Sequence, residues 1–491
     1  MGGRDQGRWL GEGCERRDKA RGQILGEKVI SMVHILDVME KALEGKPISE
    51  NDYQLKLFAA KANEKVREHG IKFDRNEVIP SDNSLADDIY RAAVELLVEV
   101  GAYCTDTSRI LSYSEEEIRG ALRNAPQEIW LGEGKERKRL APRKIEDKSP
   151  PWCFLGAGGG ACSSDRSFTT LVEGYAEIPE INAITTPALT RVGGMRIRPA
   201  SPLELLGAMR NAVYAREACN RVGRPGLPLM NSLSTAESDI ALAAALHPRY
   251  GMRASDGFLI CCMDPMKVDF NRLNKVTVVL SMGAPIGMCF GPLMGGYSGG
   301  PESTAVSNVA HHLMGVLTYQ SSWLLPFPLH LRYVSSSSRE MLWIISVTGQ
   351  AISRNTDLIS LNLNYTSAGP TTPMCLFETS ASVTAAVVSG LSIESVGVAS
   401  NKEEDRTTPV EPRISAEVAH AVAGMKRSDA NGMVNELLSK YESKLANPPL
   451  GKTLFECWDP ERRRPSPEYQ KVIRKFKKDM AKIGVDLRPE L

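Results

Sequence analysis

Short apolar segments alternate with longer helical stretches from about residue 152 to residue 400, and this alternation constrains the fold more than any other feature of the chain. Strands separated by helices build a parallel sheet covered by helices. A span of about 250 residues suits eight such units better than a doubly wound sheet. The sequence therefore predicts an α/β fold, a TIM-type (β/α)8 barrel. The candidate strands are residues 227–229, 257–262, 286–289, 329–333 and 358–361, and helical patterns such as 202–222 and 302–317 lie between them.

Additional helices are expected on both sides of the barrel core, which we place at residues 151–415. Residues 32–150 are predicted to form an N-terminal helical region that packs on the barrel, and residues 416–491 to form C-terminal helices. One helix should end at Gly101, and Ser114 should open another through a capping box with Glu117. Residues 1–31 are glycine-rich and charged, which predicts a disordered or tag-like extension.

Composition excludes several classes of function. The chain has 60 Lys+Arg against 59 Asp+Glu, so it carries no excess positive field for nucleic acid or a membrane surface. No run approaches the ~20 apolar residues of a membrane helix. Its 10 cysteines are scattered without zinc-ribbon or CxxC spacing, which indicates reduced thiols in a cytoplasmic protein. The 7 histidines form no HExxH motif, and His311 and His312 diverge around a helix, so no metal bound by the chain is expected.

Polar residues gather where the predicted strands end, and in a barrel the carboxyl ends of the strands build the site. The candidates are Asn362, Asn364 and Tyr365 after residues 358–361, Tyr297 with Gly295, Gly296 and Gly299 after residues 286–294, and His330 with Arg332 within 329–333. Each candidate also has a structural interpretation. The glycines suit a sharp loop with positive φ. Tyr365 and His330 suit interior positions where their polar atoms have hydrogen-bond partners, and Cys289 suits the position of a small buried hydrophobic residue.

Several strings of residues resemble, in order, the archaeal monomethylamine methyltransferase family. They include residues 101–110 (GAYCTDTSRI), 295–300 (GGYSGG), 329–332 (LHLR), 368–370 (AGP) and 451–457 (GKTLFEC). The resemblance covers roughly residues 50 to 488. It implies an α/β barrel, a homo-oligomer, and methyl transfer from a methylated amine to the Co(I) corrinoid of a small partner corrinoid protein. The corrinoid, a cobamide, would thus be supplied by that partner.

The sequence departs from the family where the family's site lies. The family carries pyrrolysine, read from an in-frame amber codon, whose imine is thought to capture the amine; here the corresponding place near Met230 holds ordinary residues. A family glutamate corresponds to Cys289, and a second one to Asp269. A family glutamine-tyrosine-tyrosine string appears as Leu363-Asn364-Tyr365. A changed substrate or a lost activity would each produce this pattern.

The missing imine bears on the identity of the methyl donor. A quaternary ammonium leaves as a neutral amine and needs no covalent capture, and the faces of Tyr365 and Tyr297 could hold such a cation. We therefore predict transfer from a quaternary amine or a methylamine. The alternatives are a non-catalytic barrel that binds a corrinoid protein, and a true monomethylamine methyltransferase whose amber-encoded residue is missing here. An unrelated lyase or hydrolase would need a metal or a Schiff-base lysine at a strand end, and the sequence offers neither.

Overall fold

Eight short parallel strands form the centre of the computed structural model, which describes residues 30–157, 160–230, 237–398 and 403–489. These central strands are β6 Cys153–Gly156, β8 Ala183–Thr185, β12 Leu229–Met230, β13 Phe258–Cys261, β15 Ile286–Phe290, β17 Trp323–Pro326, β19 Leu361–Thr366 and β20 Ser392–Val398. They pair as a sheet of five in the order β12-β8-β6-β20-β19 and a sheet of three in the order β13-β15-β17. Single parallel bridges, Met230 to Gly257 and Leu324 to Ser360, join the two sheets at both junctions.

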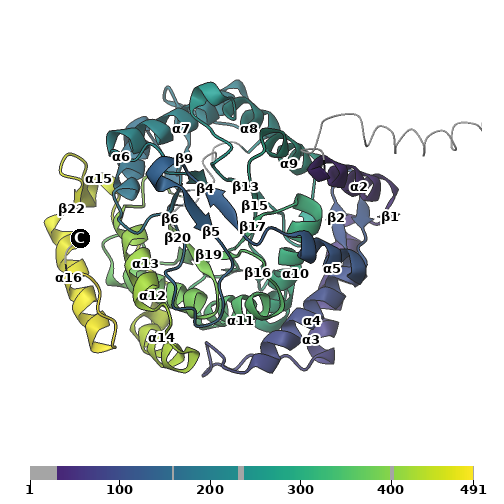
Figure 1. Cartoon of the computed structure of the whole chain (residues 1–491). Coiled ribbons are helices and arrows are strands. Elements are labelled where there is room, and N and C mark those ends of the chain that lie inside the picture. Colours follow the sequence, from purple (N-terminus) through teal and green to yellow (C-terminus); the bar gives the residue numbers. More distant parts are fainter. Residues whose placement is uncertain (1–29, 158–159, 231–236, 399–402, 490–491) are drawn as a thin grey trace, which may run out of the picture.

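Helices surround the central strands (Figure 1). They follow the strands along the chain, as the sequence alternation predicted. This layer comprises α6 Asp165–Ala176, α7 Pro202–Arg221, α8 Asp239–Ala245, α9 Phe270–Met282, α10 Pro301–Tyr319, α11 Arg339–Asn355, α12 Pro373–Val388 and α13 Val410–Ala421. α10, α11 and α12 are buried over most of their length, because further helices cover them from outside. The predicted α/β class is confirmed.

A separate apolar cluster fills the space enclosed by the strands. Its buried members are Ile129, Leu131, Leu140, Trp152, Phe154, Ala183, Met230, Cys289, Trp323, Leu325, Ile359, Leu361 and Leu363, and Leu259, Phe327 and Tyr365 pack against it. Close packing here depends on Gly287, because a Cβ at that position would lie 2.2 Å from the Trp323 ring. The indole of Trp323 therefore lies directly over the backbone of β15.

The antiparallel hairpin of β4 (Ile129–Leu131) and β5 (Lys138–Leu140) contributes three of these apolar side chains. Figure 1 shows it across the middle of the ring. Backbone bonds from Gly132 to Ser255 (2.8 Å) and from Glu133 to Gly226 (2.9 Å) fix the hairpin to segments that precede β13 and β12. The hairpin therefore covers the amino ends of the strands, and the carboxyl ends lie opposite it.

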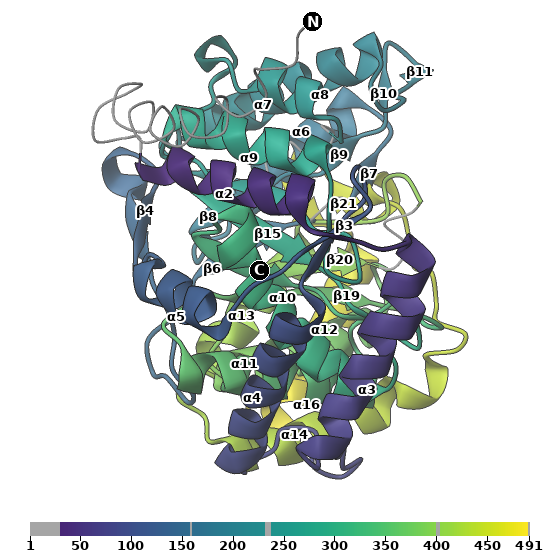
Figure 2. The same cartoon turned by 90° about the vertical axis from the view of Figure 1, so that its right-hand side faces the viewer.

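N-terminal elements pack against one side of the ring (Figure 2). Five helical segments and a small sheet, β1-β3-β2-β14, make up this region. Gly101 ends α4 and Ser114 forms the predicted capping box with Glu117. The elements are α2 Ile30–Glu44, the π-helical segment η2 Asp52–Phe58, α3 Ala59–Glu68, α4 Asn83–Val100, α5 Glu115–Asn124, β1 Lys46–Pro47, β2 Ala102–Cys104, β3 Arg109–Leu111 and β14 Lys267–Val268.

The chain ends in further helices on the outside of the ring. They are α14 Arg427–Tyr441, α15 Leu454–Cys457 and α16 Pro467–Lys482, with a small hairpin of β21 Trp458–Asp459 and β22 Arg464–Pro465. α14 packs on α12 and α16 contacts the same helix. Within the described part of the chain, none of the helices combines the length and hydropathy needed to span a bilayer. The predicted extension at residues 1–31 falls almost entirely outside the described residues.

Two candidate strands were placed incorrectly. The central strand in this part of the chain is β17, whereas residues 329–333 contribute only the short β18 (Leu329–His330), which pairs with β16 (Leu293–Met294) beyond the ends of β15 and β17. The strand expected at 358–361 begins at Leu361 and continues through Asn362–Tyr365, which we had placed after it. Both corrections change which side chains face the interior.

Candidate active site

Strand register determines which side chains face the enclosed interior at the carboxyl ends. Glu394 on β20 is the register partner of Leu363 on β19 and of Phe154 on β6, and both partners belong to the interior cluster. Side chains at matched positions of parallel strands share a face. Glu394 therefore faces the interior. By the same argument Cys261 on β13 faces inward beside its partner Cys289 on β15. We call Cys261, Cys289, Tyr365 and Glu394 the mouth cluster.

Glu394 is the unusual member of the mouth cluster. Its side chain is fully buried, and neither carboxylate oxygen meets the geometry of a hydrogen bond with any group in the described residues. Burial raises the pKa of Glu394 well above its usual value; Thr185 opposes this rise and the Cys261 thiol adds to it. An unpaired buried carboxylate costs several kcal/mol, so burial favours the neutral acid over the carboxylate. A cation placed next to it would favour the ionised form.

The two thiols of the mouth cluster differ in accessibility. Cys289 is buried, whereas Cys261 is exposed to solvent. The neighbouring Cys289 thiol lowers the pKa of Cys261 to about 7, against the effect of burial and with help from Lys275 and Arg272. A side chain that is both accessible and desolvated lies in a recess rather than on an open surface. The Arg272 guanidinium fixes this position, because its Nε donates to the Cys261 carbonyl at 2.6 Å.

Tyr365 and Met230 lie at the same end of the strands, as predicted. Tyr365 is partly buried next to Phe327, with ring centroids 6.0 Å apart, and burial together with Glu394, Cys261 and Cys289 raises its pKa. Met230 is fully buried at the end of β12. The adjoining residues 231–236, where the family's pyrrolysine would be expected, are outside the described residues.

Leu363 faces the interior, but Asn362 and Asn364 point to the opposite face of β19. Alternation along the strand separates them from Leu361, Leu363 and Tyr365, which belong to or contact the interior cluster. The Asn362 amide donates to Asn364 Oδ1 at 2.8 Å, on the side covered by helices. The structure thus does not bring the two asparagines together with Tyr365.

The glycine loop that follows β16 forms a tight turn at the rim. Gly295 and Gly299 have φ values of 88° and 73°, and the amide of Gly295 donates to the Gly299 carbonyl at 2.8 Å. The sharp loop with positive φ, which was the structural interpretation of these glycines, is therefore present. A shallow pocket of about 420 Å³ is lined by Gly295, Gly299, His330 and Arg332 together with Met294, Gly300, Pro301 and Leu331. Four of the candidates named from the sequence, Gly295, Gly299, His330 and Arg332, therefore share one depression; Gly296 follows Gly295 in the same loop.

The rim also exposes side chains that could meet a partner. Tyr297 is 39% exposed and Leu331 is 53% exposed. Burial lowers the pKa of His330, whose ring packs on Tyr333 with centroids 4.2 Å apart, and Arg332 extends over the same tyrosine. An apolar rim with one aromatic and one cationic side chain suits contact with another molecule.

Asp269 has a local structural role. It caps α9 by accepting from the Arg272 amide at 2.7 Å and also pairs with the Arg272 guanidinium. Asp269 is therefore linked to the mouth cluster through Arg272, which contacts the Cys261 carbonyl.

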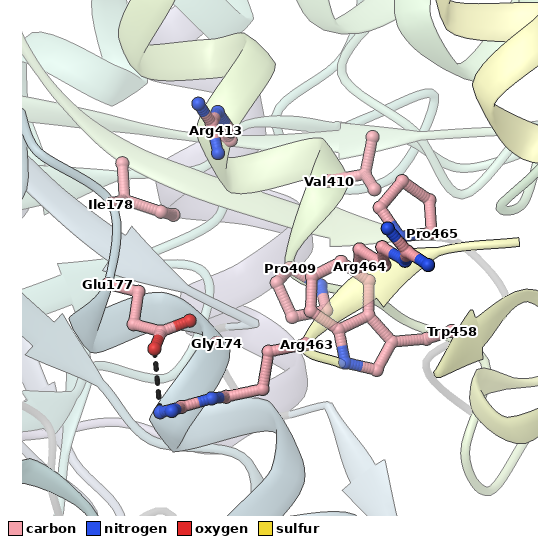
Figure 3. A pocket seen from close by; sticks show the side chains of 10 residues that line it. All are labelled: Gly174, Glu177, Ile178, Pro409, Val410, Arg413, Trp458, Arg463, Arg464 and Pro465. Atoms are coloured by element: carbon pink, nitrogen blue, oxygen red, sulfur yellow. Dashed lines mark ion pairs between the residues drawn. The ribbon is translucent and has the colours of Figure 1, made fainter. Parts of the chain in front are cut away.

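The histidine pair and a further pocket offer no competing site. His311 and His312 are buried in α10, and each Nδ1 lies 2.8 Å from a backbone carbonyl one turn earlier. Across the described ranges, no group of three or more His, Cys, Asp and Glu could hold a metal ion. A small pocket of about 60 Å³ between α6, α13 and the β21–β22 hairpin contains a Glu177–Arg463 ion pair of 2.6 Å (Figure 3). No central strand lines it.

Comparison with known proteins identifies the family. The family model for monomethylamine methyltransferase MtmB matches residues 33–485. The chain is 34% identical to monomethylamine methyltransferase MtmB1 of Methanosarcina barkeri over 451 residues, covering 91% of this chain and 97% of the relative. The chain belongs to the MtmB family. MtmB of Methanosarcina mazei is 33% identical over 451 residues, with the same coverage.

Solved MtmB structures agree with the fold. The crystal structure of Methanosarcina barkeri MtmB matches with a TM-score of 0.89 and 33% identity, over 92% of this chain and 98% of that one. A structure of an MtmB complex with hydroxylamine matches equally well. Membership of the MtmB family makes the chain a methyltransferase. The resemblance inferred from the sequence is confirmed.

Two members of the mouth cluster were missed in the sequence. Glu394 stands alone as an acid in the apolar run LSIESVGV, and a lone acid inside a buried strand is a recognisable signal. Cys261 gave no comparable signal, because its importance depends on register with Cys289, a residue 28 positions away.

Proposed function

We propose that this MtmB-family chain moves a methyl group from a methylated amine, bound as a cation, to the Co(I) corrinoid of a small partner corrinoid protein. The observation that carries the proposal is Glu394, a buried acid without a hydrogen-bond partner among the described residues, facing the strand interior in the mouth cluster. Such a group supplies the negative charge that a methylated ammonium ion lacks once it leaves water.

We also propose that the eight central strands act as one (β/α)8 barrel. The support is the sequence of parallel pairings, in which the sheets of five and three are connected by one bridge at each junction. In such barrels the site lies at the carboxyl ends of the strands. The mouth cluster comes from β13, β15, β19 and β20, so a site there would draw on both sheets.

Donor binding is assigned to the interior of the mouth. Glu394 would hold the ammonium charge, and the ring faces of Tyr365 and Phe327 would contact its methyl groups. Surrounding apolar side chains exclude water and strengthen the charge interaction. Desolvation of a quaternary cation also favours its departure as a neutral amine. Protein groups therefore bind and orient the methyl carbon, and the bound corrinoid supplies the nucleophile.

The rim has features that fit a wide, flat acceptor. Gly295, Gly296, Gly299 and Gly300 carry no side chains, and Gly295 and Gly299 line the shallow pocket with His330 and Arg332. Leu331 and Tyr297 are exposed beside them. These residues would form the surface that receives the corrinoid partner.

A quaternary amine is our first choice of donor, because no group in the mouth cluster is an electrophile able to capture monomethylamine. The second candidate is monomethylamine, which is favoured by the names of the relatives. It would need an ammonium proton retained during transfer, and Glu394 could keep the nitrogen protonated.

The test is methylation of a Co(I) corrinoid by the full chain, with glycine betaine, tetramethylammonium and monomethylamine compared as donors. We expect turnover with a quaternary amine and its loss in Glu394→Gln. The control variant is Glu378→Gln, since Glu378 is an equally buried acid that accepts from the amides of Ser367 and Ala368. Robust turnover of monomethylamine alone would refute the quaternary donor. Failure with every methylated amine would favour a barrel that only binds a corrinoid protein.

We also propose that the protein works in the cytoplasm, which is a reducing compartment, and that it assembles as a homo-oligomer. The nine cysteines within the described ranges are all free thiols, as a reducing compartment requires.

A further inference from the structure

Two members of the mouth cluster, Cys261 and Cys289, take no part in the proposed methyl transfer. They are register partners on neighbouring parallel strands, and the Cys262 amide, which donates to the Cys289 carbonyl at 2.8 Å, fixes the backbone beside them. Neighbouring strands lie about 4.8 Å apart, and disulfide-linked Cα atoms lie about 4.4–6.8 Å apart. The strands are therefore already spaced for a disulfide.

The two thiols lie on the same face. They are at matched positions on the interior face of β13 and β15, so both side chains leave the sheet on the same side. Closing a bond between them requires little movement of the main chain.

The pair is also asymmetric. Cys261 is exposed and its pKa is lowered to about 7, whereas Cys289 is buried and its pKa is raised. An accessible thiolate next to a protected thiol is the arrangement of an attacking and a resolving cysteine. Lys275 and Arg272 add to the thiolate character of Cys261, because both place positive charge near its sulfur.

We propose that Cys261 and Cys289 form a redox-active dithiol whose substrates are small-molecule disulfides. The Cys261 thiolate attacks one sulfur of the disulfide RS–SR, forming a mixed disulfide and releasing RS⁻. Cys289 then loses its proton and attacks the Cys261 sulfur, which releases the second RS⁻. The two protein thiols are oxidised to one disulfide, and RS–SR is reduced to two thiols once protons are taken up.

Oxidation would alter the recess as well as the sulfur atoms. The disulfide would connect β13 to β15 and remove the accessible thiol next to Tyr365 and Glu394. We expect the oxidised protein to bind a cationic donor more weakly, although the dithiol reaction itself does not depend on which donor the protein uses.

Cys262 provides a matched control in the next position of the chain. It is buried on the other face, its thiol donates to the Lys267 carbonyl at 3.4 Å, and burial raises its pKa to about 12. It has neither access to solvent nor a thiol partner in register.

The experiment uses the full chain under anaerobic conditions, incubated with glutathione disulfide, then denatured, alkylated and mapped by peptide mass spectrometry. In the wild type and in Cys262→Ser we expect a Cys261–Cys289 disulfide, reversed by dithiothreitol. In Cys289→Ser we expect a stable glutathione adduct on Cys261 instead, because the resolving thiol is gone. Alkylation of native Cys261 by iodoacetamide should reach half its maximal rate near pH 7.

Two results would overturn the proposal. One is full alkylation of both cysteines in the wild type after incubation, with Cys261 reacting no faster than Cys262. The other is a glutathione adduct on Cys261 that persists in the folded wild type, which would show that Cys289 does not resolve it. Circular dichroism of each variant checks that the fold is retained, and the wild-type peptide map answers the question even if a variant fails to fold.

Discussion

Replacing Glu394 by glutamine should stabilise the protein at neutral pH while weakening donor binding. In the folded chain the acid keeps its proton, because burial raises its pKa well above the usual 4.5. The unfolded chain releases that proton as soon as the pH passes the usual value. Each pH unit above it therefore costs the native state about 1.4 kcal/mol. The cost grows with pH until the pH passes the raised pKa, and glutamine, which has the same shape and no proton to lose, avoids it.

The sign of the pH dependence follows from the same argument. The free energy of unfolding of the wild type should fall, relative to Glu394→Gln, as the pH rises from 4.5 towards the raised pKa. At pH 4.5 and below the two proteins should differ by less than about 1 kcal/mol, because both side chains are then neutral in both states. Urea unfolding at several pH values between 4.5 and 8 measures this difference directly.

Donor binding should show the complementary effect. A cation next to Glu394 favours the carboxylate, so binding releases a proton, and the affinity of a quaternary amine should rise about tenfold per pH unit below the raised pKa. Calorimetry in two buffers of different ionisation enthalpy counts the released proton. Glu378→Gln should instead lose stability, because the side-chain NH2 of glutamine cannot accept from one of the two backbone amides, and should keep donor binding. A difference between wild type and Glu394→Gln that does not vary with pH would refute the reasoning.

Three further perturbations test other parts of the structure. Tyr365→Phe should lower turnover about tenfold but change the free energy of unfolding by only about 1 kcal/mol; an unfolded variant would make Tyr365 structural. Gly296→Val places a Cβ 3.2 Å from Leu293 at the rim, and should lower methyl transfer to a corrinoid protein about tenfold or more while calorimetry shows unchanged donor binding. Gly120→Val on α5 is the control variant. An unaltered transfer rate in Gly296→Val would place the acceptor elsewhere. Asp256→Asn leaves the buried Arg216 guanidinium without its charged partner, and should cost about 3–5 kcal/mol in urea unfolding. Glu217→Gln, in an exposed pair with Arg221, should cost less than about 1 kcal/mol.

The sequence predicted the class of fold because the hydrophobic pattern changes period along the chain. It failed at β17, where the apolar segment Trp323–Pro326 is only four residues long and ends in proline, a residue that counts against a strand. The nearby run 329–333, in which apolar and polar residues alternate, was chosen instead. Its first two residues do form a strand, but outside the central ring. The sequence pattern alone cannot tell which of two such runs is a central strand, because that depends on the neighbouring strand with which each run pairs.

The candidate site shows the same division between local and long-range information. Tyr365 and the glycine loop could be placed from the strand-end rule. Asn362 and Asn364 were expected in the site because they follow the predicted strand 358–361, yet they lie within β19 and their side chains bond to each other on the helix-covered face. Glu394 could have been found as a lone acid within an apolar run. The pairing of Cys261 with Cys289 could not, because register between strands is a property of the folded chain.

In the proposed barrel, the β4–β5 hairpin and the apolar cluster close the amino end of the strands. Substrates must then enter and leave by the carboxyl end, which is also the end that an acceptor protein would have to cover during transfer. The donor has to arrive before the acceptor docks, and the demethylated amine has to wait until the acceptor leaves. Steady-state kinetics should therefore be ordered, with the amine product competing with the donor and not with the acceptor. A hairpin far from the reacting atoms would in this way set the order of the catalytic cycle.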